Sequence, residues 1–122
     1  MENKTIPLAV PDVGDDEIDE IRKVFDTKFL TEGKTTKEFE EQVASYLGVK
    51  HAIAVTSCTT GLHAVFEGLN IKGQEVLVPD YTYPATAEAV VLAGGIPVLT
   101  DVDIESMNMT SEILEEAYDE KM

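Results

Sequence analysis

The second half of the chain alternates short apolar runs with segments of helical spacing, and this alternation restricts the fold most strongly. The apolar runs that fit strands are HAIAVT at 51–56, EVLVP at 75–79 and IPVLTDV at 96–102. Segments of helical spacing follow them at 61–69, 84–93 and 110–118. Strands that alternate with helices of this length are typical of βαβ units, which build a parallel sheet. The sequence therefore predicts an α/β fold with right-handed crossovers.

Residues 1–50 are expected to be mainly helical. Apolar side chains at helical spacing predict a first helix over 15–26, and its acidic start suits the positive end of the helix dipole. A second helix is predicted to begin at a capping box formed by Thr35 and Glu38 and to end at Gly48.

Composition and charge exclude several classes of protein. Acidic residues outnumber basic ones 24 to 9, and the net charge of -15 repels nucleic acid. No apolar run approaches the roughly 18 residues of a membrane span, and the N-terminus lacks the apolar segment of a signal peptide. The one cysteine, Cys58, rules out an internal disulfide and fits a reducing compartment. We expect a cytoplasmic protein with no nucleic-acid or membrane partner.

A turn after the first predicted strand has the composition of an anion site. TSCTTG at 56–61 places small hydroxyl and thiol residues, with successive backbone N–H groups, at a predicted helix N-terminus, which suits a phosphate. Ordinary helix capping by Ser57 or Thr59 explains the same residues about equally well. The turn lacks the glycine spacing and the lysine of a P-loop, which argues against a Walker-type NTPase.

A second turn, PDYTYPAT at 79–86, follows the next predicted strand at the same edge of the sheet. Tyr83 precedes a proline at the expected first helical position, so its ring projects from a constrained backbone. A ring beside a phosphate site could stack on a flat cofactor, although plain packing is the simpler explanation of a tyrosine before a helix.

Two weaker candidates are explained without catalysis or metal binding. Cys58 could act as a nucleophile at a helix N-terminus, but His51 starts a strand and His63 lies a turn into the helix. Asp101 and Asp103 could bind a hard metal ion, but the end of a strand and a turn account for them more simply. We expect no metal site.

Three stretches together resemble the DegT/DnrJ/EryC1/StrS family, the pyridoxal-phosphate-dependent sugar aminotransferases of fold type I. They are FLTEGKTTKEFEEQVASYLGVKHAIAVTSCTTGLHAVFEGL, GQEVLVPDYTYPATAEAVVLAGGIPVLTDVD and MNMTSEILEEA. The resemblance implies the N-terminal part of the large domain of the aspartate aminotransferase-like fold. We therefore expect residues 1–122 to be a single partial domain, with N-terminal helices over 1–50 and the strand–helix segment over 51–122.

The resemblance also assigns roles to the two turns. It implies that Ser57, Cys58 and Thr59, with Thr60 as a further member, hold the phosphate of pyridoxal 5'-phosphate through backbone amides and a hydroxyl. It implies that the ring of Tyr83 stacks on the pyridine ring. Tyrosine departs from the phenylalanine or tryptophan that is commoner in the family, but its face can still stack.

The catalytic residues that the resemblance implies do not map to this chain. In the family, the aspartate that pairs with the pyridine nitrogen and the lysine that forms the Schiff base come later in the sequence. Lysines of this chain do not match that motif, among them Lys28, Lys34, Lys37, Lys50, Lys72 and Lys121. We expect the chain to hold part of the cofactor site and no catalytic residue.

The resemblance implies an N-terminal fragment of an enzyme that moves an amino group from a glutamate-type donor to a keto sugar, usually nucleotide-linked. Two alternatives stay open: a truncated, non-enzymatic module that binds phosphate or a partner protein, and a sugar dehydratase of the same family, in which histidine replaces the lysine.

The family fold has a consequence for the first predicted strand, because strands from later in the sequence separate it from the other two. In the isolated chain we expect that strand 51–56 either pairs beside strand 75–79 or is completed by another chain. We expect a homo-oligomer, because the helix over 84–93 is too apolar to face water.

Overall fold

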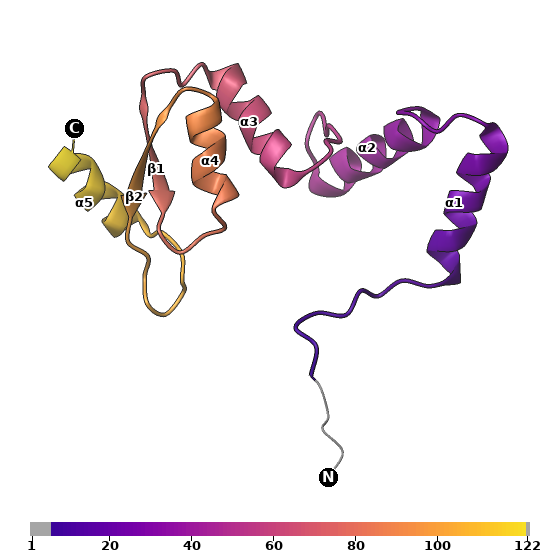
Figure 1. The fold of residues 1–122 in the computed structure, drawn as a ribbon, viewed down its shortest axis with the longest axis horizontal. Coiled ribbons are helices and arrows are strands. Elements are labelled where there is room, and N and C mark those ends of the chain that lie inside the picture. The colour runs from indigo at the N-terminus through magenta and orange to yellow at the C-terminus, as the bar shows by residue number, and fades with distance from the viewer. Residues whose placement is uncertain (1–5, 122) are drawn as a thin grey trace, which may run out of the picture. The chain divides into compact units, whose positions relative to one another are not determined.

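The computed structural model describes residues 6–121, with side chains as far as Tyr118. These residues form two compact units, one that ends at Ala54 and one that begins at Val55 (Figure 1). The first unit contains helices α1 (Asp15–Thr27) and α2 (Lys34–Leu47). The second contains α3 (Cys58–Leu69), β1 (Glu75–Pro79), α4 (Ala85–Leu92), β2 (Ile96–Thr100) and α5 (Ser111–Lys121).

Helix α1 confirms the first predicted helix and extends it by one residue. Its N-cap is Gly14, whose backbone N–H donates a hydrogen bond of 2.6 Å to Oε2 of Glu17. The helix ends at Lys28, which adopts a left-handed conformation with φ of 61°. The acidic first turn therefore stabilises the start of the helix through both a hydrogen bond and the helix dipole.

The capping box predicted for Thr35 and Glu38 is wrong. Helix α2 begins two residues earlier than that box requires, at Lys34, with Gly33 as an N-cap that has no side-chain bond. Thr35 is therefore inside the first turn, and Oε1 of Glu38 lies 3.4 Å from Nζ of Lys34 instead. The predicted stop is confirmed, because Gly48 has φ of 67°, a left-handed conformation that glycine adopts without strain.

The second unit contains the parallel βαβ arrangement that the sequence predicts. Strand β1 pairs with β2 in parallel register, from Glu75 opposite Ile96 to Pro79 opposite Thr100, and α4 forms the crossover between them. The second of these strands ends at Thr100, two residues before the predicted end of 96–102. The α/β fold class is confirmed for this part of the chain.

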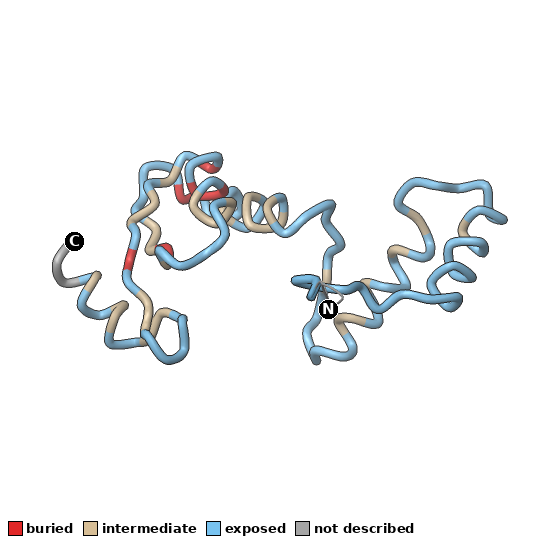
Figure 2. Tube along the Cα trace, turned by 60° about the horizontal axis from the view of Figure 1, so that its bottom comes forward, coloured by how far each residue is buried: buried red, intermediate tan, exposed pale blue. Residues whose placement is uncertain are grey.

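The buried core lies where α4 packs on the two strands. Figure 2 shows the buried positions gathered in this region of the second unit, and the core residues are Ile71, Val78, Ala89, Val90 and Ala93. The expectation that the helix over 84–93 does not face water is confirmed at Ala89 and Val90, which are buried, and is wrong at Val91 and Leu92, which are 59% and 62% exposed. The main contacts of this helix are with β1, β2 and α3, and they leave Val91 and Leu92 exposed.

The strand expected over 51–56 does not form in the part of the chain that the structure describes. Its sheet contains β1 and β2 alone, so residues 51–56 do not pair beside β1. Strand pairing needs a partner, and the backbone N–H of Ala54 bonds instead to Oε1 of Glu40, at 2.7 Å. Every helix within residues 6–121 is too short or too polar to cross a bilayer.

Candidate functional site

The turn before α3 is held by two residues that cap each other. Ser57, in extended backbone conformation, is the N-cap, and its Oγ accepts a hydrogen bond of 3.2 Å from the backbone N–H of Thr60. In return, Oγ1 of Thr60 accepts a bond of 3.0 Å from the backbone N–H of Ser57. The helix therefore begins at Cys58, three residues before the predicted start, and Ser57 is the capping residue.

The hydroxyl of Thr60 is the centre of the turn. It donates to the backbone carbonyl of Ser57 at 2.8 Å and lies 3.2 Å from the hydroxyl of Thr56. These contacts occupy the side chain of Thr60 within the turn itself. Of the residues predicted to hold a phosphate, Ser57 and Thr60 thus maintain the turn through their hydroxyls.

The free donors of the turn are backbone amides. Among the described residues, the N–H groups of Cys58 and Thr59 have no assigned acceptor, whereas that of Gly61 bonds to the carbonyl of Ser57 at 3.1 Å. Ser57 and Cys58 are exposed and Thr59 is half-buried. Unpaired amides at the positive end of a 12-residue helix suit an anion. A phosphate can therefore be accommodated without breaking any bond of the turn.

Tyr83 lies at the entry to α4 with an exposed ring. Pro84 is the N-cap of that helix, and the carbonyl of Tyr83 accepts a bond of 2.9 Å from the N–H of Thr86. The side chain of Tyr83 is 79% exposed, so plain packing in a core does not account for it. The local turn fixes the backbone while the ring is free for another molecule.

Tyr83 lies between the end of β1 and the start of α4. Helices α3 and α4 contact each other, and α4 begins at the end where β1 and β2 finish (Figure 1). Ligands of open α/β folds bind at this edge of the sheet. That the Ser57–Thr60 turn lies beside Tyr83 at this edge stays a prediction, because the strand 51–56 that would place the turn there does not form in the described part of the chain.

The structure offers Cys58 no histidine partner within the described residues. His63, one turn along α3, has its Nε2 at 3.3 Å from Oε1 of Glu67. The two atoms are close, but their geometry is not that of a hydrogen bond, so the contact is weak. Nucleophilic catalysis by Cys58 has no support in this arrangement.

The two aspartates after β2 bind their own turn. Oδ1 of Asp101 accepts a bond of 2.8 Å from the N–H of Val102, and Oδ1 of Asp103 accepts one of 2.8 Å from the N–H of Ser106. The backbone and side-chain hydrogen bonds from Ser106 lower the pKa of Asp103 below its ordinary value. No group of three or more metal-binding side chains occurs in the described part of the chain.

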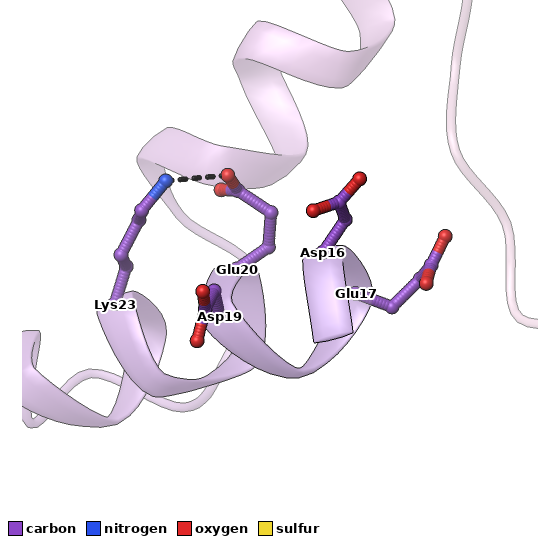
Figure 3. A pocket seen from close by; sticks show the side chains of 5 residues that line it. All are labelled: Asp16, Glu17, Asp19, Glu20 and Lys23. Atoms are coloured by element: carbon purple, nitrogen blue, oxygen red, sulfur yellow. Dashed lines mark hydrogen bonds and ion pairs between the residues drawn. The ribbon is translucent and has the colours of Figure 1, made fainter. Parts of the chain in front are cut away.

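Acidic side chains also surround a shallow hollow on α1. Figure 3 shows Asp16, Glu17, Asp19 and Glu20 on this surface, with Lys23 paired to Glu20. All of these residues are exposed. The hollow has the character of a solvated helix surface.

Comparison with known proteins identifies the family. The model of the DegT/DnrJ/EryC1/StrS aminotransferase family matches residues 11–122. The chain belongs to this family. Among its relatives, the spore coat polysaccharide biosynthesis protein SpsC of Bacillus subtilis is 33% identical over 116 residues, which are 94% of this chain and 30% of SpsC.

Solved structures of the family have the same fold. The putative sugar aminotransferase Spr1654 of Streptococcus pneumoniae, in its PLP form, superposes with a TM-score of 0.86 and 30% identity, over 93% of this chain and 29% of Spr1654. The GDP-4-keto-6-deoxy-D-mannose-3-dehydratase of E. coli superposes with a TM-score of 0.80 and 30% identity, over 93% of this chain and 31% of the dehydratase.

These comparisons confirm the fold class. The structure corresponds to the N-terminal part of the large domain of fold-type I enzymes, and the chain spans about 30% of the length of SpsC and a similar share of both solved relatives.

Proposed function

We propose that this chain is the N-terminal part of a pyridoxal-phosphate-dependent enzyme that transfers an amino group from a glutamate-type donor to a nucleotide-linked keto sugar. The observation that carries the proposal is the self-capped turn at Ser57, whose two unpaired amides suit a cofactor phosphate in a chain of this family. The same proposal treats residues 1–122 as one partial domain of a cytoplasmic homo-oligomer with no nucleic-acid or membrane partner.

In this proposal the residues of the turn have two different tasks. The amides of Cys58 and Thr59, together with Ser57, bind the phosphate of pyridoxal phosphate, while the hydroxyl of Thr60 keeps the turn formed. Because Ser57 and Thr60 already bond to each other, the amides are preorganised, and binding requires little ordering of the loop. The cofactor, when bound, supplies an electron sink for chemistry at the carbon that bears nitrogen.

Tyr83 has the task of positioning. Its backbone is constrained by Pro84 and by the turn to Thr86, so the exposed ring can pack on one face of a flat heterocycle. Stacking restricts rotation of the cofactor about its phosphate and excludes water from that face. We assign no proton transfer to any side chain of residues 1–122, and we expect the chain alone to be inactive.

A dehydratase of the same family is the second candidate function. The superposition on the E. coli 3-dehydratase, at a TM-score of 0.80, supports it nearly as well as the aminotransferase. Within the family a lysine or a histidine separates the two activities, and the resemblance maps that position to none of the residues 1–122. A truncated module that binds only phosphate or a partner protein is the third reading.

The stacking role is tested by a matched pair of tyrosines. Tyr81 and Tyr83 lie in the same turn and are 68% and 79% exposed. We expect Tyr83→Ala to weaken binding of pyridoxal phosphate, followed by absorbance, and to leave binding of inorganic phosphate unchanged. The control Tyr81→Ala is expected to change neither affinity. Equal losses in both variants, or a loss of phosphate binding in Tyr83→Ala, contradict the assignment.

A further inference from the structure

Residues 52–56 have the properties of a segment that pairs readily with other strands. The sequence AIAVT contains no charge, no proline and no glycine, and it is rich in apolar and β-branched residues. Ile53 and Val55 are 79% and 51% exposed. Exposed segments of this composition can serve as templates for the same segment of another molecule.

One side chain, that of Glu40, accepts a hydrogen bond from the backbone of this segment. Within the part of the chain that the structure describes, the bond from Ala54 N–H to Oε1 of Glu40, at 2.7 Å, is the sole hydrogen bond assigned to the backbone of 51–55. Glu40 is half-buried on α2, on the same side as the half-buried Val43 and Ala44. After α2 ends at Gly48, the chain reverses direction, and Ala54 lies beside Glu40.

We propose that Glu40 is a gatekeeper for residues 52–56, and that its hydrogen bond to Ala54 prevents this segment from pairing with the same segment of a second copy of the chain. A strand that adds to 52–56 on this side must bond to the amide of Ala54, and the carboxylate of Glu40 already occupies that donor. Natural proteins place charged side chains in the same way to protect edge strands. This role is independent of the cofactor turn.

The test compares three variants of the 122-residue chain. Glu40→Ala removes the acceptor, and Glu40→Gln keeps an acceptor while removing the charge. Glu41→Ala removes the same charge from the adjacent, exposed position of α2. The two measurements are the water-exchange rate of the Ala54 amide by NMR, and self-association by light scattering and thioflavin fluorescence across a concentration series.

We expect Glu40→Ala to exchange the Ala54 amide about fivefold faster, the effect of losing one ordinary hydrogen bond, and to associate at lower concentration than the parent chain. Glu40→Gln and Glu41→Ala are expected to stay near the parent chain in both measurements. The amides of Val43 and Ala44, half-buried on α2 itself, report that the mutated unit of each variant is folded.

Three results overturn the proposal. The first is an unchanged Ala54 exchange rate in Glu40→Ala, and the second is faster exchange without increased association. The third is association of Glu41→Ala or Glu40→Gln as strong as that of Glu40→Ala, which assigns the effect to net charge rather than to the bond.

Discussion

Oγ of Ser57 and Oγ1 of Thr60 lie 3.2 Å apart, and each accepts a hydrogen bond from the backbone N–H of the other residue. The sequence alone presents capping and anion binding as competing explanations of this turn. In the structure the two are compatible, because the hydroxyls satisfy the turn and leave the amides of Cys58 and Thr59 for a ligand. Capping is what shapes the candidate site.

This arrangement predicts the effect of removing the cap. We expect Ser57→Ala to lower the free energy of unfolding by about 1 kcal/mol, because α3 loses its N-cap acceptor. It is also expected to weaken phosphate binding at the turn. Urea unfolding measures the first effect. Ser45→Ala, at an exposed site inside α2, is the control and should change stability by less than about 0.5 kcal/mol; equal losses in both variants contradict a capping role.

Glu17 predicts a pH dependence at the start of α1. The backbone N–H of Gly14, and next the helix's own backbone, lower the pKa of Glu17 from its ordinary value of 4.5. A lowered folded pKa means that the stabilisation is present above the pKa of the unfolded chain and is lost as pH falls through the lower folded value. An NMR titration should show the Gly14 amide following this midpoint, and the transition should vanish in Glu17→Gln. A midpoint at or above 4.5 contradicts the prediction.

A larger side chain at Gly95 is expected to disturb the packing of the core. A Cβ at this position would lie 2.7 Å from Cδ1 of Ile71 and 2.9 Å from Cγ1 of Val90, two members of the core. We expect Gly95→Ala to destabilise the second unit by about 1–3 kcal/mol in urea unfolding. At Gly68 in α3, by contrast, an added Cβ would meet nothing within 4 Å. Gly68→Ala should therefore raise stability by about 0.5–1 kcal/mol, and a loss there as large as at Gly95 refutes the steric argument.

The sequence predicts correctly those features that depend on residues close together along the chain, and it fails where distant residues decide the structure. The β1–α4–β2 unit follows from apolar runs, turn residues and spacing, which are all read along the chain, and the sequence predicts it correctly. The failure at residues 51–56 has a nonlocal cause, because a strand needs a partner and composition does not reveal whether one is present. The same holds for Leu92, whose exposure depends on what packs against α4.

The start of α2 could not be predicted reliably even from neighbouring residues, because two candidate N-caps lie close together. Thr35 and Glu38 have the spacing of a capping box, but Gly33 can also serve as an N-cap, and the helix begins two residues earlier. At the candidate site, the sequence correctly locates a capped turn before α3, whereas the cofactor roles of that turn and of Tyr83 stay predictions. The hydrogen bonds between Ser57 and Thr60 decide which backbone amides stay free. They are seen in the structure and could not be predicted from the sequence.

Activity is predicted to be absent from the 122-residue chain. Without a positioned general base and acid, the roughly 100- to 10,000-fold contribution of such catalysis is missing. Borohydride reduction after addition of pyridoxal phosphate should label several lysines, among them the exposed Lys23 and Lys34. An aminotransferase assay with glutamate and a nucleotide keto sugar is expected to show no turnover. Label concentrated on one lysine, together with measurable turnover, contradicts the prediction.

The central claim is that the Ser57–Thr60 turn holds a phosphate, and amide NMR during titration with inorganic phosphate tests it most directly. We predict saturable shifts at the amides of Cys58 and Thr59. The first-turn amides of α1, which are flanked by acidic side chains, should stay unchanged and serve as an internal control. Silent Cys58 and Thr59 amides, with shifts clustered elsewhere in the chain, would contradict the claim.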